Sequence, residues 1–284
     1  MSDAEALPTW SARASSVGYY LTCSYRAAFD RAISTGIASE QVQAAFTASK
    51  GTPSPYADFG TCVHFVLQDG IRATFPGKPV EYAPTEAEWL NAAKLFGDDL
   101  AATQKQARTV ATLAGKHLPS LPAGVTWLAE KEFVTPIVQG HIDFLSSDGE
   151  EIWDLKTTTR IPEHNRIKPE HMYQLVTYHL LSRAKRGGIL YVDMRANWAL
   201  PIPVDFTTPE MVELAEHTLE YLEFIRGPGL FNVAIPQIGP HCAAQFCPYS
   251  QICRDRYIPM SREVHYAHTP RPSAKVASIP GLSA

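Results

Sequence analysis

The chain has 284 residues, of which 45% are apolar and 19% charged, an ordinary composition for a globular protein with a substantial core. Its formal net charge of −4 excludes an overall basic surface, so an anionic partner must be met by local positive charge or by metal ions. No run of about 18 apolar residues occurs, which excludes a typical membrane span. Because the first residues lack the basic and apolar regions of a signal peptide, we expect a cytoplasmic protein.

The first part of the chain has helical periodicity. The expected helices cover residues 11–35, 38–50 and 61–71, with a Gly/Pro-rich loop over 51–60. The segment 84–113 opens with Thr85 and, three residues later, Glu88. This is the capping-box pattern that starts many helices, so long helices are predicted here.

From residue 125 onward the apolar pattern changes to alternation, which is typical of strands. The expected strands cover residues 126–136, 138–146, 151–159, 188–195 and 198–206. Helices are expected over 169–186 and, after the cap Thr208-Pro209, over 210–227. The Pro- and Ser-rich segment 258–284 is expected to be a flexible tail. The order of these elements predicts a single α/β domain with helical flanks.

A hairpin places four polar residues on one face of two strands. Asp148-Gly149 is the strongest short signal for a two-residue type I′ turn. This turn puts Asp143 directly opposite Asp154, and it puts His141 opposite Lys156. The Cβ atoms of such opposed residues lie about 5 Å apart. The other face of the hairpin is apolar and suits packing against a helix.

Two carboxylates opposed across a strand pair repel each other, and a divalent cation that bridges them removes this penalty. Oxygen ligands of this kind suit Mg²⁺ or Mn²⁺. Lys156 lies two residues after Asp154 on the same face, where it can orient a water that attacks a metal-bound phosphate. The alternative is a solvated hairpin face whose charges keep a sheet edge soluble.

Four motifs in order resemble the PD-(D/E)xK nuclease superfamily. They are the G-x-x-x-H of "GTCVH" (Gly60 to His64), Gly140 with Asp143, Asp154-x-Lys156, and Gln174-x-x-x-Tyr178. The closer likeness is to the RecB-like branch, which includes CRISPR-associated and AddB-type nucleases and many phage exonucleases. It extends from about residue 15 to residue 257, and a set of motifs in this order is far more specific than a lone D-x-K.

The resemblance implies a restriction-endonuclease-like core, with a mixed central β-sheet flanked by helices. It implies one nuclease domain over residues 1–257. The parts of this domain are a helical part (11–118), a sheet core (125–206) and a C-terminal helix with a cysteine cluster (208–257).

The resemblance also implies roles for individual residues. The predicted ligands of one or two metal ions are His64, Asp143, Asp154 and the Leu155 backbone carbonyl, with Lys156 positioning the water. Gln174 and Tyr178 are four residues apart on one helix face, from which they are expected to orient the substrate strand. Relatives often add a glutamate on the preceding strand. Glu130 and Glu132 both qualify by alternation, and Glu132 is preferred.

Four of the five cysteines resemble the iron–sulfur staple of this branch. Cys23 stands near the start, and Cys242, Cys247 and Cys253 cluster near the end. In the relatives, four thiolates hold a 4Fe-4S cluster that joins the N- and C-terminal segments. Here four residues separate Cys242 from Cys247, where the relatives usually have two. Zn²⁺ at the four-cysteine site and unligated core cysteines are the alternatives, and Cys62 is expected to be packed in the core.

The resemblance implies an Mg²⁺- or Mn²⁺-dependent deoxyribonuclease, exonuclease rather than endonuclease, for DNA processing, recombination or repair. The alternatives are a non-catalytic nuclease-fold subunit of a recombination or CRISPR-adaptation complex, and an enzyme that cleaves RNA at the same site. The expected partners are DNA and a helicase, recombinase or annealing protein. An oligomer is compatible with the resemblance. The sequence has no phosphate-binding G-x-x-x-x-G-K-[ST] loop, so helicase activity would come from a partner.

Overall fold

The computed structural model describes residues 10–50, 54–74, 83–227, 230, 247, 249 and 253. The chain divides into two compact units. The sheet unit consists of Pro53–Phe133 and Gly140–Ala215, and the terminal unit consists of Met1–Thr52, Val134–Gln139 and Glu216–Ala284. Both units are discontinuous in sequence. The expectation of one domain over residues 1–257 stays a prediction, and the expected tail, 258–284, lies outside the described residues.

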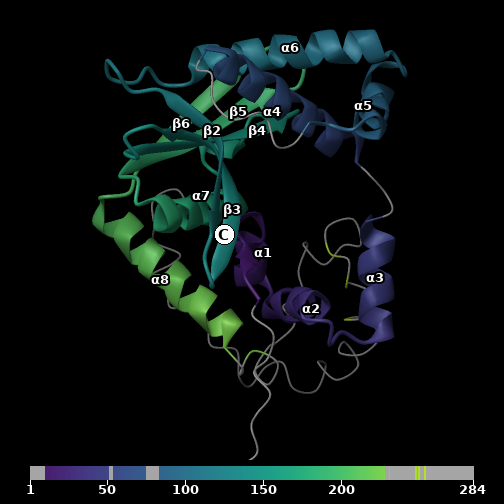
Figure 1. The fold of residues 1–284 in the computed structure, drawn as a ribbon, viewed down its shortest axis with the longest axis vertical. Helices are drawn as coiled ribbons and strands as arrows, with labels where there is room; N and C mark the ends of the chain where they lie inside the picture. The colour runs from purple at the N-terminus through teal and green to yellow at the C-terminus, as the bar shows by residue number, and fades with distance from the viewer. Residues whose placement is uncertain are drawn as a thin grey trace, which may run out of the picture. The chain divides into compact units, whose positions relative to one another are not determined.

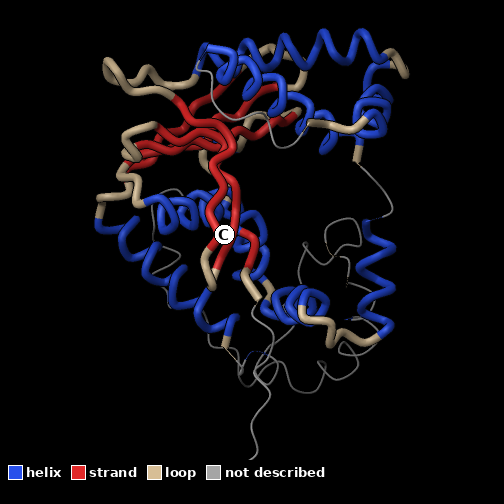
Figure 2. Tube along the Cα trace, viewed as in Figure 1, coloured by secondary structure: helices blue, strands red, loops and turns tan. Residues whose placement is uncertain are grey.

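The strands of the sheet unit form a mixed sheet, shown in red in Figure 2. They are β2 (Trp127–Val134), β3 (Val138–Ser146), β4 (Glu151–Thr158), β5 (Arg186–Asp193) and β6 (Ala199–Asp205). The order is β3-β4-β5-β6, with β2 pairing with β3. The β4–β5 pair is parallel, whereas the β3–β4 and β5–β6 pairs are antiparallel. This is the mixed sheet that the resemblance implies.

Helices cover both faces of this sheet (Figure 1). They are α4 (Pro55–Thr74), α5 (Glu86–Ala93), α6 (Leu100–His117) and α7 (Pro169–Ser182), with the 3₁₀ turns η2 (Lys94–Phe96) and η3 (Glu163–Asn165). Helices α4 and α6 share an apolar core with one face, and α7 packs on the other. That core includes Phe59, Val63, Val110, Phe144, Trp153, Leu155 and Leu190. None of the described helices has the length and apolar character needed to cross a membrane.

Most helix boundaries agree with the expectation, including the capping box of Thr85 and Glu88 at the start of α5. Helix α4 begins at Pro55 instead of residue 61, because proline is well suited to the first turn of a helix. Helix α7 ends at Ser182 instead of residue 186, because Arg183 adopts a left-handed conformation with φ 65°.

The register of the β3–β4 hairpin is the expected one. Phe144 lies opposite Trp153, and Leu145 lies opposite Ile152. Continuing this register along both strands puts Asp143 opposite Asp154. The side chains of Asp143 and Asp154 therefore share one face of the hairpin, as the sequence predicts.

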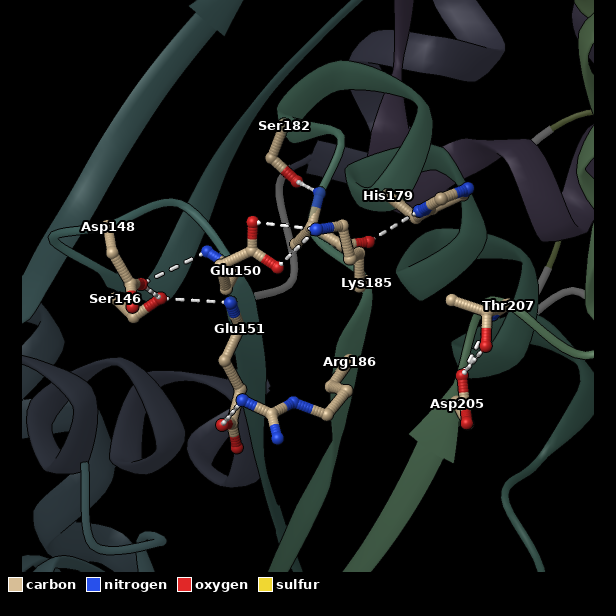
Figure 3. A network of polar contacts seen from close by, with 11 residues as sticks. Ser146, Asp148, Glu150, Glu151, His179, Ser182, Lys185, Arg186, Asp205 and Thr207 are labelled. Atoms are coloured by element: carbon tan, nitrogen blue, oxygen red, sulfur yellow. Dashed lines mark hydrogen bonds and ion pairs between the residues drawn. The ribbon is translucent and has the colours of Figure 1, made fainter. Parts of the chain in front are cut away.

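The turn that joins these strands is not the expected type I′ turn. A type I′ turn needs positive φ at both central residues, and of Asp148 and Gly149 only Gly149 (φ 77°) has it. The Asp148 carboxylate instead accepts hydrogen bonds from Ser146 Oγ (2.6 Å) and from the Glu150 N–H (3.1 Å), as Figure 3 shows. Strand pairing stops at Ser146 and Glu151, which leaves a four-residue loop. Two-residue and four-residue loops centred on the same bond give the same register.

The terminal unit contains β1 (Ala12–Arg13), η1 (Ala14–Ser16), α1 (Val17–Thr22), α2 (Ser24–Ser34), α3 (Glu40–Lys50) and the part of α8 (Pro209–Arg226) from Glu216 onward. Strand β1 pairs in parallel with the first two residues of β3. The single helix expected over 11–35 is interrupted at Cys23, whose extended backbone (φ −156°, ψ 102°) separates α1 from α2. The break falls on a residue that the resemblance makes a cluster ligand.

Buried polar contacts hold distant segments of the terminal unit together. Arg31, which is 4% exposed, donates from its guanidinium to the carbonyls of Ile225 (3.1 Å) and Gly227 (2.6 Å). The Asp30 carboxylate accepts hydrogen bonds from the hydroxyls of Tyr20 (3.0 Å) and Tyr249 (2.6 Å). These contacts join α2 to the end of α8 and to Tyr249.

Candidate metal centre

Three potential metal ligands from three different elements meet in the sheet unit. His64, Glu130 and Asp143 each offer one ligand atom, and these three atoms lie within 4.8 Å of one another. His64 comes from α4, Glu130 from β2 and Asp143 from β3. His64 Nδ1 lies 3.4 Å from Asp143 Oδ2. We call these three residues and the neighbouring Asp154 the acidic cluster.

Asp154 and Lys156 complete this arrangement from β4. Lys156 Nζ lies 2.7 Å from Asp154 Oδ2, and the Asp154 side chain is 1% exposed. At this distance the ammonium forms a charge-assisted contact with Oδ2, and this carboxylate oxygen has a second lone pair besides. Between the two, the Leu155 N–H donates to Asp143 Oδ2 at 2.7 Å. The predicted D-x-K pair thus lies beside Asp143 with one carboxylate oxygen still able to bind a cation.

The two predicted residues of α7 support Asp154. Gln174 Nε2 donates to Asp154 Oδ1 (3.2 Å) and to the Tyr178 hydroxyl (2.8 Å). Both residues are buried. In this structure they hold the carboxylate in place rather than reach outward to a substrate strand.

The structure brings Glu130, and not Glu132, to the acidic cluster. Simple alternation puts both on one face, but Glu130 has a left-handed backbone (φ 51°) that breaks the alternation of β2. Gln68 Nε2 donates a hydrogen bond to the Glu130 carboxylate. Glu132 is exposed and lies 3.8 Å from His141 Nε2. Gln68 could have been found from sequence, since it follows His64 by one helical turn.

Burial disfavours the ionised form of the carboxyl groups in the acidic cluster. Burial raises the pKa of Glu130, and the nearby Asp143 raises it further. Burial also raises the pKa of Asp154, an effect that the Lys156 ammonium opposes without cancelling. For Asp143, burial is outweighed by His64 and Lys156, so its pKa is lowered. For His64, burial is outweighed by Asp143, so its pKa is raised.

A divalent cation would relieve this electrostatic cost. Three of the four residues offer carboxylate oxygens, the ligands that Mg²⁺ and Mn²⁺ prefer, and Asp154 Oδ2 has an unused lone pair in a buried position. Of the predicted ligands, His64 and Asp143 lie in the group of converging ligand atoms together with Glu130, and Asp154 is a neighbouring carboxylate. The Leu155 carbonyl stays a predicted ligand. The residues present fit a divalent metal ion.

Of the predicted cluster cysteines, Cys23, Cys247 and Cys253 are described and Cys242 lies outside the described residues. The three described cysteines form no disulfide with one another, and all belong to the terminal unit. Cys23 and Cys247 are buried, and Cys247 packs with Val42 and Tyr249. Among the described residues, no cysteine belongs to a group of three ligand atoms close enough together to hold one metal ion. Their joint ligation of a cluster stays a prediction.

Cys62 is fully buried in the apolar core of the sheet unit, the environment expected for it. Burial raises the pKa of its thiol to about 12, with smaller contributions from Glu88 and Asp58. The thiol therefore stays protonated and unreactive at neutral pH.

Two solved structures match this chain with low identity and low TM-scores. The crystal structure of SSO0001 is 14% identical with a TM-score of 0.31, and the match covers 66% of this chain and 94% of that one. A phage-related exonuclease from Haemophilus somnus 129PT is 11% identical with a TM-score of 0.35, and the match covers 78% of this chain and 95% of that one. No curated protein matches the chain at a significant level.

The family model of the PD-(D/E)XK nuclease superfamily matches residues 11–254. This match spans most of the 284 residues and includes every residue of the acidic cluster, together with Lys156 and the α7 pair. The chain therefore belongs to the PD-(D/E)XK nuclease superfamily.

Proposed function

We propose that this protein is a metal-dependent DNA nuclease, and specifically an exonuclease. The observation that carries the proposal is the buried Asp154 carboxylate, held 2.7 Å from the Lys156 ammonium and close to Asp143. A buried carboxylate that is paired with a lysine beside further carboxylates costs stability, and such perturbed groups cluster at functional sites.

In this proposal Asp143, Asp154, Glu130 and His64 hold one or two Mg²⁺ or Mn²⁺ ions. When bound, such an ion stabilises the charge that develops on the phosphoryl and leaving oxygens. Lys156 orients the attacking water through its ammonium N–H groups. Gln174 keeps the Asp154 carboxylate in one orientation through its 3.2 Å hydrogen bond. Gln68 does the same for Glu130.

The choice of DNA and of exonucleolytic action rests on the likeness to the RecB-like branch. The exposed loop between β4 and α7 supports a nucleic-acid substrate in general, because it carries Arg160, Arg166 and Lys168. Charge of this kind contacts phosphates without reading the sequence, so binding should weaken steeply with salt.

The proposal is tested by incubating the protein with Mn²⁺ and end-labelled single- and double-stranded DNA and RNA. We expect stepwise shortening of DNA from an end. Release of internal fragments would indicate an endonuclease, and cleavage of RNA alone would favour the RNA-cleaving alternative. Lys156→Ala should abolish cleavage, and an unchanged rate in this variant would contradict the catalytic assignment.

A non-catalytic subunit of a recombination or CRISPR-adaptation complex is the remaining alternative. Against it stands the completeness of the acidic cluster, since a site that no longer catalyses can lose ligands freely. Failure of every substrate to be cleaved, in the presence of either metal, would favour this alternative.

We also propose that Cys23, Cys242, Cys247 and Cys253 bind a 4Fe-4S cluster with a structural role. Support comes from the placement of Cys23 at the α1–α2 break and of the buried Cys247 in the same compact unit. Protein purified without oxygen should be brown and contain four irons per chain, the stoichiometry of a 4Fe-4S cluster. Colourless protein with one zinc per chain would establish the Zn²⁺ alternative.

A further inference from the structure

Next to Lys156 lies a hydrogen-bonded pair, the buried Tyr191 and the partly exposed His171, that none of the recognised motifs includes. Tyr191 of β5 is the strand neighbour of Lys156 on β4, and it is fully buried. Its hydroxyl lies 2.7 Å from His171 Nδ1 and 3.1 Å from the backbone nitrogen of Lys168. A tyrosine hydroxyl at the base of a sheet face thus contacts the first turn of α7.

The hydrogen bonds of Tyr191 fix the position of the proton on His171. The Lys168 N–H can only donate, so the Tyr191 oxygen accepts it. If Nδ1–H also donated to this oxygen, the buried Tyr191 O–H would have no acceptor among the described residues, which is costly. The Tyr191 O–H therefore donates to Nδ1, and the ring proton of His171 is on Nε2.

His179, at the other end of α7, shows the opposite arrangement (Figure 3). Its Nδ1 lies 2.7 Å from the Ala184 carbonyl, which can only accept, so the proton of His179 is on Nδ1. The two histidines of one helix are thus held in different tautomers by their partners. Only His171 presents an N–H donor at its outer nitrogen.

His171 belongs to the face of α7 that faces the acidic cluster. It precedes Gln174 by three residues and Tyr178 by seven, so the three side chains share one helical face. Gln174 contacts Asp154 directly. His171 is partly exposed, and no described residue accepts a hydrogen bond from its Nε2–H. The Nε2–H of His171 is therefore a hydrogen-bond donor at the border of the acidic cluster.

The surroundings favour an anionic acceptor for this donor. Burial, together with the ammonium groups of Lys156 and Lys168, lowers the pKa of His171 to about 3, so the imidazole is neutral at physiological pH. The acids nearby in sequence, Glu163 and Glu170, are balanced by Arg166 and Lys168. A neutral N–H beside two cations suits a phosphate oxygen better than a positively charged or apolar ligand.

We propose that His171 Nε2–H donates a hydrogen bond to a phosphate oxygen of the bound strand, next to the scissile phosphate on the side where α7 begins. Tyr191 acts as a positioning residue that keeps the proton on Nε2. This inference rests on the proposed nuclease function, and it adds a substrate-binding residue that the motifs do not contain.

Two substitutions of His171 separate this role from a structural one. His171→Asn keeps an acceptor near the position of Nδ1, and so the bond to Tyr191, but removes the outer donor. His171→Gln keeps a donor near the position of Nε2 but loses the inner bond. A substrate-binding role predicts that Asn is the damaging change, whereas a structural role predicts that Gln is.

The measurement is the affinity for labelled DNA in Ca²⁺, which does not depend on cleavage. We expect His171→Asn to weaken binding about tenfold or more, the factor that one charge-assisted hydrogen bond supplies, and His171→Gln to recover most of the loss. His179→Asn is the matched control on the same helix. Equal affinity of the wild type and His171→Asn would overturn the proposal. A wild type that binds DNA but never cleaves it would count against the proposed function alone.

A second measurement locates the contact. Single methylphosphonate substitutions remove the charge of one phosphate at a time from the DNA. One position should weaken binding by the wild type but cause no further loss in His171→Asn. If every position weakens both proteins by the same factor, His171 contacts no phosphate and the proposal is wrong.

Discussion

Gly60 of α4 lies against Thr157 of β4 so closely that a Cβ atom on the glycine would come within 2.8 Å of Thr157 Oγ1. Real Cβ atoms do not approach this closely, so the helix can reach the strand only with glycine at this position. His64 follows one helical turn later and contacts Asp143. The G-x-x-x-H spacing therefore has a physical meaning: the glycine brings the helix to the strand, and the histidine then reaches the acidic cluster.

Gly60→Ala should lower nuclease activity strongly, because α4 must move away from β4 and His64 moves with it. We expect a loss of at least about tenfold in kcat/KM, as is usual when a ligand is misplaced by a fraction of an ångström. Gly70→Ala on the same helix is the control. A Cβ there meets nothing within 4 Å, so the change should stabilise the protein by about 0.5–1 kcal/mol. Equal activity of both variants would show that the close approach has no catalytic consequence.

Glu130→Gln and Glu132→Gln should differ in metal binding. Glu130 is in the acidic cluster, whereas Glu132 is exposed beside His141. The Mn²⁺ affinity measured by titration calorimetry should fall at least about tenfold for Glu130→Gln and stay at the wild-type value for Glu132→Gln. A larger loss of Mn²⁺ affinity in Glu132→Gln than in Glu130→Gln would show that Glu132 is the metal ligand.

Addition of Mn²⁺ should raise the melting temperature of the wild-type protein. Burial raises the pKa values of Glu130 and Asp154, so the cluster is costly when its acids are ionised and a cation removes that cost. An increase of about 3 kcal/mol in stability is expected at a metal concentration of about one hundred times Kd. Asp154→Asn should show a much smaller increase. An identical shift in both proteins would mean that the cation binds elsewhere.

Acid should destabilise the protein partly through His171. Its pKa falls from 6.5 in the unfolded chain to about 3 in the folded protein, with burial as the largest cause. Over this interval the unfolded chain takes up a proton that the folded protein does not, so the free energy of unfolding falls as the pH is lowered. The contribution is at most about 2 kcal/mol between pH 6.5 and pH 5.

Urea unfolding at about pH 7 and about pH 5 checks this contribution. The stability of His171→Asn should depend less on pH than that of the wild type, because asparagine does not titrate. Parallel pH dependence of the two proteins would contradict it.

Gly149→Ala should lower stability by about 1–2 kcal/mol, because the left-handed backbone that Gly149 adopts (φ 77°) brings the Cβ atom of alanine too close to a carbonyl oxygen. Gly149→Asn should recover part of this loss, since asparagine tolerates that conformation. Cleavage should stay at the wild-type rate in both variants. A loss of activity larger than the loss of folded protein would mean that the turn itself, and not strand alternation, fixes the register.

The hairpin also shows what could be predicted from the sequence. The register of Asp143 and Asp154 was predictable because one face of each strand is apolar, and a slip by one residue would move the carboxylates of one strand onto that apolar face. The turn type was not predictable, because the Asp148 side chain accepts the hydrogen bonds of Ser146 and Glu150, and this replaces the two-residue turn.

Two other features depend on backbone conformations that composition does not reveal. The left-handed conformation of Glu130 decides which glutamate reaches the acidic cluster, and a non-glycine residue with positive φ has no sequence signal. The extended backbone of Cys23 interrupts a segment whose periodicity is helical on both sides. In contrast, His171 could have been found, because it lies on the helical face already defined by Gln174 and Tyr178.

The contacts of Arg31 and Asp30 also set an order of folding during synthesis. Arg31 donates to the carbonyl of Ile225, 194 residues later, and Asp30 accepts from Tyr249, 219 residues later. All residues of the sheet unit leave the ribosome before Ile225 does. The sheet unit can therefore fold first, while the buried charges of α2 wait for their partners. Helix α2, although made early, is thus among the last elements to complete its native contacts.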